Sequence, residues 1–210
     1  MRQIKDEFNM QSIDNKILTI VSKRGRGSIF FSSDFSSLGE SKTILKSLER
    51  LTNNNKIIRL ARGMYYYPKI DKVLGLGVLY PSLEEIAQAI AKRDKARIVP
   101  TGLYALNKLG ISTQVPMNVV YLTDGSPRNI KIGNGKGIKF KHVVPKKLAF
   151  QNELAMLVTL ALSEIKEENV TSEHLSQIKK VLRNEKKENI MKDASLMPAW
   201  IKSIITKAYE

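Results

Sequence analysis

Residues 41–67, SKTILKSLERLTNNNKIIRLARGMYYY, decide which fold this sequence predicts. Its first twelve residues have apolar side chains at helical spacing and predict an amphipathic helix that ends at three asparagines, which favour turns. The apolar stripe of this helix is Ile44, Leu45, Leu48 and Leu51. The runs 56–60 and 64–67 are rich in β-branched and aromatic residues and predict two strands. The Ala-Arg-Gly sequence at 61–63 joins them as a tight hairpin, since glycine accepts the positive φ that such turns need.

The segment that precedes this stretch adds a helix, a strand and one or two helical turns. Residues 13–21 have a helical apolar pattern with Ser12 or Asp14 available as an N-cap, while 28–31 predict a strand and 32–38 predict helical turns. The resulting order of helix, strand, helix, helix and hairpin is that of a winged helix-turn-helix, whose recognition helix reads the major groove of DNA. We therefore expect residues 1–70 to form a winged helix-turn-helix DNA-binding domain.

The rest of the chain, residues 71–210, predicts a larger mixed α/β domain. Ser82 and Glu85 have the spacing of a capping box at a helix start, and strand-like runs recur at 118–122, 128–132 and 138–144. From about residue 151 the apolar spacing is helical. The predicted fold class is α+β, with an N-terminal winged helix-turn-helix followed by a mixed domain that has a helical C-terminal end.

The charge of the chain is strongly positive and unevenly distributed. Thirty-five Lys and Arg against 20 Asp and Glu give 210 residues a net charge of +15. Residues 1–70 have 13 basic and 6 acidic side chains (+7), residues 71–150 have 13 and 5 (+8), and residues 151–210 have 9 of each. A basic surface of this size favours polyanions, so the first 150 residues are where a nucleic acid is expected to bind.

The sequence does not favour catalysis, and we expect no enzymatic activity, no metal site and no cofactor. It has no cysteine and two histidines, which excludes thiolate metal sites and cysteine nucleophiles. The glycine run 133–137 lies between two predicted strands, so it lacks the helix N-terminus that holds phosphate in a phosphate-binding loop. Asp124 and His142 could form an acid–base pair, but the sequence identifies no third partner.

The apolar pattern favours a cytoplasmic protein without a membrane partner. The first seven residues contain Arg2, Lys5, Asp6 and Glu7 rather than the apolar core of a signal peptide. The longest nearly apolar run, 154–162, is about half the length that a membrane-spanning helix needs.

Candidate DNA contacts lie on the predicted recognition helix, in the loop at 23–27 and at the tip of the hairpin. They are hydroxyl and cationic side chains, which hydrogen-bond to phosphates and base edges. The candidates are Lys23, Arg24, Arg26, Ser41, Lys42, Thr43, Lys46, Arg50 and Arg62. Two other interpretations stay open: a solvated helix face, and a winged fold used for protein contacts.

A second basic region runs from Ser126 to Phe150, with seven cations and no acidic residue. Lys139 and Lys141 alternate with Ile138 and Phe140, so one face of this predicted strand is basic. A possible nucleic-acid or partner surface consists of Arg128, Lys131, Lys139 and Lys141. A solvated sheet face is the equally weighted alternative.

Four short blocks of this sequence, in order, resemble the AbiEi family of antitoxins from AbiE-type (type IV) toxin–antitoxin and phage-defence modules. The blocks are KRGRG at 23–27, LARGMYYYP at 60–68, TGLYALNKLGISTQVP at 101–116 and VYLTDG at 120–125. The resemblance covers about residues 12–145, and the last sixty residues match no motif of the family.

This resemblance implies a DNA-binding antitoxin and transcriptional autorepressor. It implies that the N-terminal winged helix binds double-stranded DNA at inverted repeats in its own promoter, through the loop, helix and wing cations named above. It also implies that the C-terminal region counters a co-encoded nucleotidyltransferase-type toxin without a stable complex.

The residues leave other functions open. One is a winged-helix transcriptional regulator whose C-terminal domain senses a ligand, and another is a module that binds RNA or a partner through the basic strands. A single winged helix buries little DNA surface, so tight binding needs two copies on a repeat, as a dimer or as cooperating monomers. We expect a monomer or a weak dimer.

Overall fold

The computed structural model describes residues 12–114, 116–133 and 135–210, so the first eleven residues of the predicted 1–70 domain lie outside the described part. The described chain divides into two compact units. The division falls between Ile90 and Ala91, beyond the predicted boundary at residue 70, and the short turn at 132–133 is grouped with the first unit. Both units mix helices with antiparallel or mixed sheets, so the fold class is α+β, as predicted.

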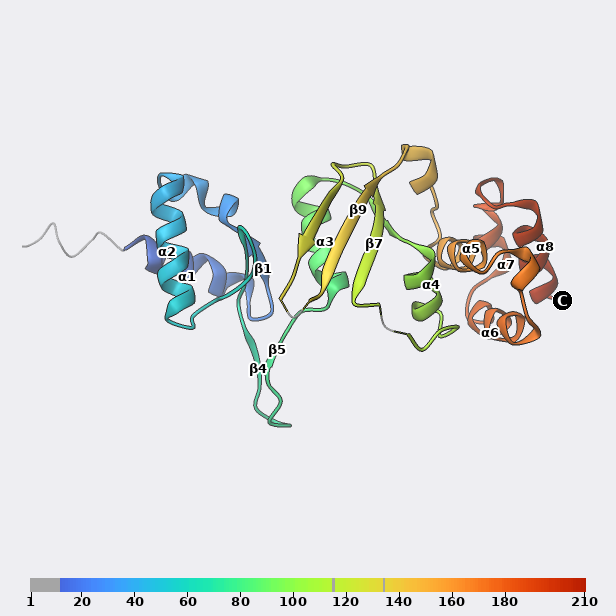
Figure 1. Cartoon of the computed structure of the whole chain (residues 1–210), viewed down its shortest axis with the longest axis horizontal. Helices are drawn as coiled ribbons and strands as arrows, with labels where there is room; N and C mark the ends of the chain where they lie inside the picture. Colours follow the sequence, from blue (N-terminus) through green and yellow to red (C-terminus); the bar gives the residue numbers. More distant parts are fainter. Residues whose placement is uncertain (1–11, 115, 134) are drawn as a thin grey trace, which may run out of the picture. The chain divides into compact units, whose positions relative to one another are not determined.

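The first unit has the element order of a winged helix-turn-helix (Figure 1). Its helical part consists of α1 (Ile13–Arg24), the 3-10 helix η2 (Ser32–Leu38) and α2 (Ser41–Asn53). Its strands are β1 (Ile29–Phe31), β2 (Ile58–Ala61) and β3 (Met64–Tyr66), in the antiparallel order β1-β3-β2. Strand β1, which lies between α1 and η2 in the chain, therefore pairs with the predicted β2–β3 hairpin and makes the sheet three-stranded.

Local sequence signals account for the ends of these elements. The hydroxyl of Ser12 accepts a hydrogen bond from the backbone N–H of Asn15 at 3.3 Å and so caps α1, one of the two predicted caps. Gly63 has a φ of +70° in the turn between β2 and β3, which explains the need for glycine there. The buried core of this unit comprises Ile17, Val21, Phe30, Phe35, Ile44, Leu48, Leu51, Ile57 and Tyr65.

Two positions of α2 differ from the predicted helical pattern. Leu45, predicted to be part of the apolar stripe, is 45% exposed, whereas Ser47, which is outside the predicted stripe, is fully buried. The stripe of α2 therefore runs through Ile44, Ser47, Leu48 and Leu51. Ser47 is tolerated inside because its hydroxyl accepts a hydrogen bond from Arg50 Nη2 at 3.0 Å.

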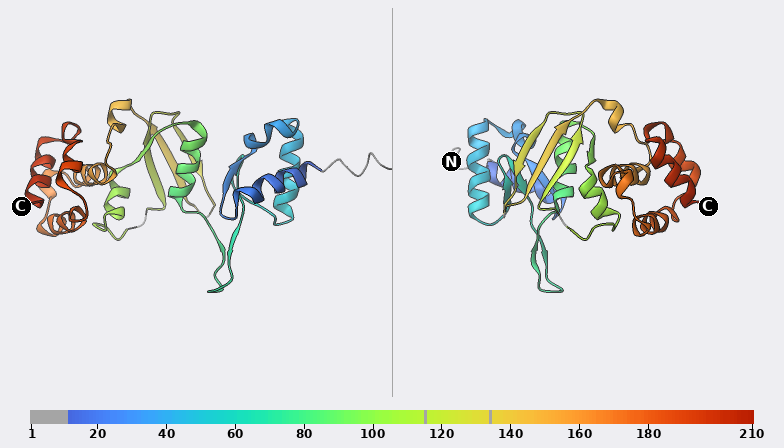
Figure 2. Two further views of the ribbon diagram at one scale, coloured as in Figure 1. Left: turned by 180° about the vertical axis from the view of Figure 1, so that it is seen from behind. Right: turned by 45° about the vertical axis from the view of Figure 1, so that its right-hand side comes forward.

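A second hairpin, which the sequence analysis missed, follows the winged sheet. Strands β4 (Lys69–Asp71) and β5 (Gly77–Leu79) pair with each other in a separate two-stranded antiparallel sheet. The hairpin extends away from the three-stranded sheet of its unit (Figures 1 and 2). The Tyr66 hydroxyl donates to the carbonyl oxygen of Leu79 at 2.5 Å, which attaches the base of the hairpin to β3.

The second unit is built on a four-stranded mixed sheet in the order β6-β7-β9-β8. Its strands are β6 (Ile98–Pro100), β7 (Asn118–Thr123), β8 (Arg128–Lys131) and β9 (Gly137–His142). β7 and β9 are parallel, and the other two pairs are antiparallel. Helix α3 (Leu83–Asp94) leads into this unit, and the 3-10 helix η3 (Pro145–Leu148) follows its last strand.

Helices make up the C-terminal end of the second unit, in agreement with the predicted fold class (Figure 2). They are α5 (Glu153–Ile165), η4 (Glu167–Asn169), α6 (Ser172–Leu182), α7 (Lys187–Met191), η5 (Ala194–Leu196) and α8 (Ala199–Ala208). α5 is the most apolar of the longer helices and packs against α4 (Gly102–Lys108), α7 and α8. A side chain larger than hydrogen at Gly102 would collide with Glu164, so glycine allows the close approach of α4 and α5.

A buried carboxylate fixes the start of α5. Asp193 is 2% exposed and accepts backbone hydrogen bonds from Gln151 at 3.0 Å and from Asn152 at 2.8 Å. The side chain of Asn152 in turn caps α5 by accepting from the N–H of Ala155 at 2.9 Å. Asp193 therefore links the segment after α7 to the first turn of a helix 40 residues earlier in the chain.

Candidate nucleic-acid interface

Helix α2 exposes a cationic side across from strand β2. Lys42 and Lys46 are exposed on α2, together with Ser41 and Thr43, all four of them predicted contacts. Lys42 and Lys46 line an open groove of about 420 Å³ that also includes Arg59 of β2. The full lining is Lys42, Leu45, Lys46, Glu49, Thr52, Asn53, Arg59 and Tyr65. Three cations and one carboxylate, Glu49, thus border a groove that suits the phosphate backbone.

Arg59 was missed by the sequence analysis. It lies opposite Tyr65 on the neighbouring strand, exposed between the partly buried Ile58 and the buried Leu60. The alternation of this cation with apolar residues could have indicated an outward-facing side chain. Burial raises the pKa of Tyr65, which keeps its hydroxyl neutral beneath the groove.

A second hollow, rich in hydroxyl groups, lies at the start of α2. It has a volume of about 350 Å³ and is lined by Ser32, Ser33, Ser36, Gly39, Ser41 and Ile44. The backbone N–H of Ser32 donates to the carbonyl oxygen of Gly63 at 3.0 Å, so this hollow adjoins the tip of the β2–β3 hairpin. Arg62, the predicted wing contact, is therefore at the end of the sheet where α2 begins.

The loop at 23–27 meets the other end of the sheet at Gly27. The N–H of Gly27 donates to the carbonyl oxygen of Tyr67 at 2.8 Å, whereas Arg62 precedes the opposite end of β3. Lys23 is exposed, but Arg24 makes an ion pair with Asp34 at 2.5 Å. Arg26 donates to the carbonyl oxygen of Pro68 at 3.0 Å and lies over the ring of Tyr67. The structure thus gives Arg24 and Arg26 structural partners. Arg26 lies at the end of the sheet opposite Arg62, whereas Arg24 reaches Asp34, which also accepts from the N–H of Phe31 at the Arg62 end of the sheet.

Arg50 forms an ion pair that links helices α1 and α2. Its Nε and Nη2 donate to the two carboxylate oxygens of Asp14 on α1, at 3.0 and 2.6 Å. These hydrogen bonds hold the pKa of Asp14 below its ordinary value. This bidentate ion pair gives Arg50 a structural role in packing α2 on α1, and its predicted contact with DNA stays a prediction.

The pH dependence of stability reports on this ion pair. Because the pKa of Asp14 is lowered in the folded state, the pair stabilises the fold above the ordinary range of an aspartate and is lost as the pH falls through the lowered pKa. We expect Asp14→Asn to lower the melting temperature at neutral pH, with a difference that shrinks as the pH falls below the ordinary aspartate pKa of about 4 and vanishes below the lowered pKa. Thermal unfolding of both proteins across this range tests it, and a difference independent of pH would contradict it.

The four basic residues predicted on the second unit divide between two faces of its sheet. Lys139 and Lys141 are exposed on one face of β9, and Lys131 is exposed on β8. Arg128 pairs with Phe140 in register, lies over its ring at 5.4 Å and contacts the carboxylate of Asp94. Arg128 therefore belongs to the face of β9 that is buried, and the prediction that it shares a surface with the lysines is wrong.

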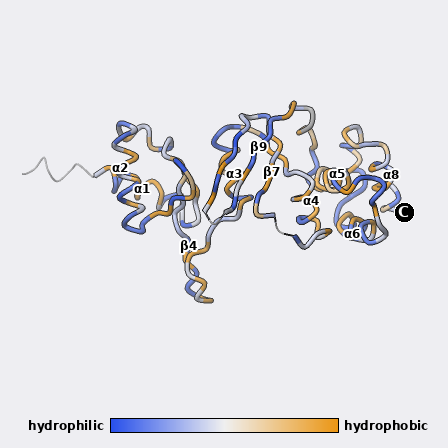
Figure 3. Tube along the Cα trace, viewed as in Figure 1, coloured by the Kyte–Doolittle hydropathy of each residue, from blue (hydrophilic) through white to orange (hydrophobic). Residues whose placement is uncertain are grey.

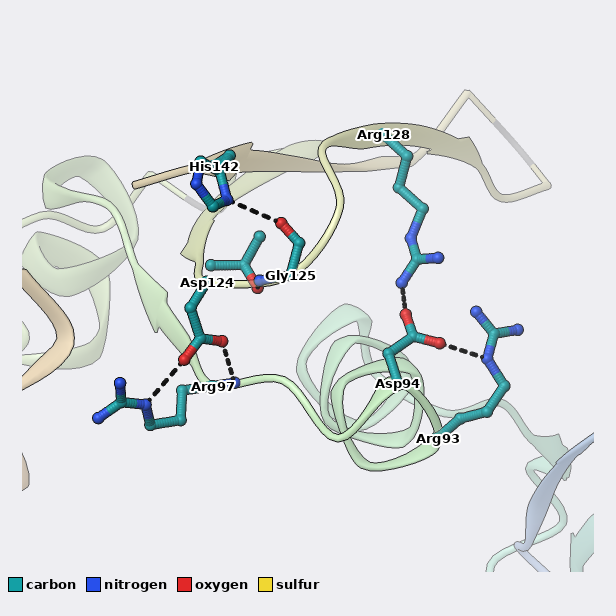
Figure 4. A network of polar contacts seen from close by, with 8 residues as sticks. Arg93, Asp94, Arg97, Asp124, Gly125, Arg128 and His142 are labelled. Atoms are coloured by element: carbon teal, nitrogen blue, oxygen red, sulfur yellow. Dashed lines mark hydrogen bonds and ion pairs between the residues drawn. The ribbon is translucent and has the colours of Figure 1, made fainter. Parts of the chain in front are cut away.

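A network of polar contacts beside this sheet gives Asp94, Asp124 and His142 their hydrogen-bond partners (Figure 4). Asp94 also accepts from Arg93 Nε at 2.7 Å, and Asp124 accepts from the backbone N–H and the Nε of Arg97. Burial and the nearby charge of Arg93 lower the pKa of Arg128. His142 Nδ1 makes its hydrogen bond with the carbonyl oxygen of Gly125 at 3.0 Å, so the considered pair of Asp124 and His142 is directed to different partners.

Residues 12–114, 116–133 and 135–210 contain no group of three or more His, Cys, Asp or Glu side chains that could hold a metal ion. Within the same ranges, each helix is too short or too polar to cross a bilayer.

Comparison with known proteins identifies one family. The model of DUF6088, described as a family of unknown function, matches residues 16–190. No curated protein matches the sequence. The matched segment covers most of both units described above and ends before α8.

Proposed function

The chain belongs to the DUF6088 family, whose function is unknown, and we propose that it is a DNA-binding antitoxin that represses its own promoter, as the resemblance to AbiEi implies. In this proposal it acts in the cytoplasm, has no enzymatic activity and binds inverted repeats in double-stranded DNA. Its functional partner is a co-encoded nucleotidyltransferase toxin, which it counters without a stable complex.

The DNA-binding part of this proposal rests on one observation, the cationic groove between α2 and β2. Lys42, Lys46 and Arg59 are exposed on a winged helix-turn-helix, in which this helix has the place of the recognition helix. The hydroxyl groups at the start of α2 add donors for phosphate oxygens beside the backbone N–H groups of a helix N-terminus. Arg62 adds a cation at the same end of the sheet.

The antitoxin half rests on the sequence blocks that resemble AbiEi. The segment TGLYALNKLGISTQVP covers α4 and the turn that follows, and VYLTDG covers the end of β7. Both blocks belong to the second unit, which we propose counters the toxin. The basic face with Lys131, Lys139 and Lys141 is our candidate surface for this action.

Titration of the full chain against the DNA upstream of its gene tests the repressor half. At about 50 and 200 mM salt, we expect binding that is tighter than to a scrambled sequence and weaker at the higher salt, because phosphate contacts release counterions. Equal affinity for the two sequences would contradict a specific repressor.

Expression of a neighbouring nucleotidyltransferase gene with and without this protein tests the proposed antitoxin function. Growth arrest that this protein does not relieve would contradict it.

The basic sheet face favours one alternative, a second unit that binds RNA or an acidic partner. Lys131, Lys139 and Lys141 are exposed without an acidic neighbour on β8 or β9. RNA binding that is unaffected by substitutions in α2 but lost on Lys139→Glu with Lys141→Glu would favour this function.

A further inference from the structure

The hairpin of β4 and β5 contains several hydrophobic residues (Figure 3), and many of them are exposed. The exposed fractions are 47% for Ile70, 92% for Val73, 75% for Leu74, 64% for Leu76 and 66% for Tyr80. Clusters of exposed large apolar side chains on this scale mark interaction surfaces. A two-stranded hairpin is only marginally stable alone in water, and in the described chain neither β4 nor β5 pairs with a third strand.

Side-chain hydrogen bonds nevertheless support the hairpin at its turn and at its base. The carboxylate of Asp71 accepts backbone hydrogen bonds from Val73 at 2.8 Å and Leu74 at 3.2 Å, which fixes the turn. The hydroxyl of Tyr66 fixes the base through Leu79. An ordered apolar arm with a free strand edge favours addition of another strand.

We infer that two copies of this chain associate through their β4 edges, which pair antiparallel around a twofold axis at Ile70. In this register Lys69 of each copy lies opposite Asp71 of the other, and the two Ile70 side chains meet on the axis. Opposite charges and apolar side chains directly across an antiparallel pair both stabilise it. The short sequence Lys-Ile-Asp of β4 is therefore complementary to itself, as a twofold interface requires.

The twofold arrangement also brings the exposed apolar side chains at the tip of one β4–β5 hairpin close to those at the base of the other. Antiparallel pairing directs the tip of one arm, with Val73, Leu74 and Leu76, toward the base of the other. Tyr80 is exposed at that base, directly after β5. Apolar side chains at the tip thus approach an exposed aromatic side chain, which removes both from water.

The charges along β4 favour a second copy of the chain, rather than DNA, as the partner that binds this hairpin. Along β4 the cation Lys69 is followed by the carboxylate of Asp71, which would repel a phosphate backbone lying along the strand. An arm that tracks DNA would gain from an uninterrupted row of cations. The two ion pairs of the twofold arrangement use both charges.

Cysteine cross-linking tests the position of the twofold axis. The natural chain has no cysteine, so Ile70→Cys introduces one thiol, which would lie opposite its own copy within reach of a disulfide. The matched control is Val73→Cys, at a position about twice as exposed. Under mild oxidation without DNA, we expect Ile70→Cys to form disulfide-linked dimer several times faster. Equal or faster cross-linking of Val73→Cys would show that exposure alone governs the reaction and would overturn the inference.

Charge exchange tests the contact between Lys69 and Asp71. Sedimentation of the unmodified full chain at about 300 mM salt, which screens its net positive charge, should show a dimer at a chain concentration of about 200 µM. Lys69→Glu and Asp71→Lys should each abolish the dimer, and their mixture should restore it by pairing each new charge with its opposite. A mixture that stays monomeric, or an unmodified chain that is monomeric at about 200 µM, would overturn the inference. Because DNA is absent, these outcomes are independent of the proposed repressor function.

Discussion

Reversal of two charges on α2, Lys42→Glu with Lys46→Glu, is expected to lower the affinity of the full chain for its operator at least about 100-fold. A hydrogen bond to a charged group is worth about 1.5–3 kcal/mol, so two lost phosphate contacts account for this factor. The slope of log affinity against log salt should also become shallower by about two, one for each phosphate contact. Fluorescence anisotropy at four or more salt concentrations measures both quantities.

The control variant has the same change of net charge as the double reversal on α2, but in a different unit of the chain. Lys179 and Lys180 are exposed on α6, and their double reversal to glutamate changes the net charge by the same amount. This variant should bind DNA within a factor of about three of the unmodified chain, because α6 belongs to the other unit and contributes no residue to the proposed interface. An equal loss of affinity in both variants would mean that overall charge, rather than the groove of α2 and β2, governs binding.

The substitution Asp193→Ala is expected to destabilise the second unit by about 2–4 kcal/mol. It removes the acceptor of the backbone hydrogen bonds from Gln151 and Asn152, and it leaves these donors without their partner at the start of α5. A loss of this size should lower the melting temperature by several degrees. Differential scanning calorimetry or circular dichroism at neutral pH measures the shift.

Asp193→Asn is the matched control for this prediction. The amide keeps one acceptor oxygen and almost the same volume, so it should lose clearly less stability than alanine. If both substitutions have the same effect, the carboxylate contributes through packing rather than as an acceptor for α5. DNA binding should be unchanged in both variants at a temperature where they remain folded, because the proposed interface lies in the other unit.

Those parts of the fold that depend on local patterns could be predicted from the sequence. The helix 41–53 and the hairpin that follows it have strong periodicity, turn residues and β-branched content, and the structure places them within a few residues of the prediction. The β4–β5 hairpin was missed because Pro68 indicates the end of a strand and the flanking residues do not alternate clearly. Its strands are three residues each, too short to produce a periodic signal.

The partners of individual cations could not be predicted, because they come from distant parts of the sequence. Arg50 and Asp14 are 36 residues apart, and nothing in either segment indicates the other. The face of Arg128 depends on the register of β8 against β9, which a one-residue shift would reverse. Lys42 and Lys46 were correctly predicted to be exposed, because the apolar stripe of α2 largely defines its opposite side.

The central position of β3 has a consequence for biosynthesis. Strand β1 is made early, but its partner β3 follows about 35 residues later, since Ile29 pairs with Tyr66 and Phe31 with Met64. At a translation rate of about 5–20 residues per second, the nascent chain spends roughly two to seven seconds with Phe30 and Phe31 synthesised and their strand unpaired. The same delay separates the emergence of β1 from the ribosome from that of β3. Until residues 64–66 have also emerged, the nascent chain presents an unpaired apolar strand to chaperones.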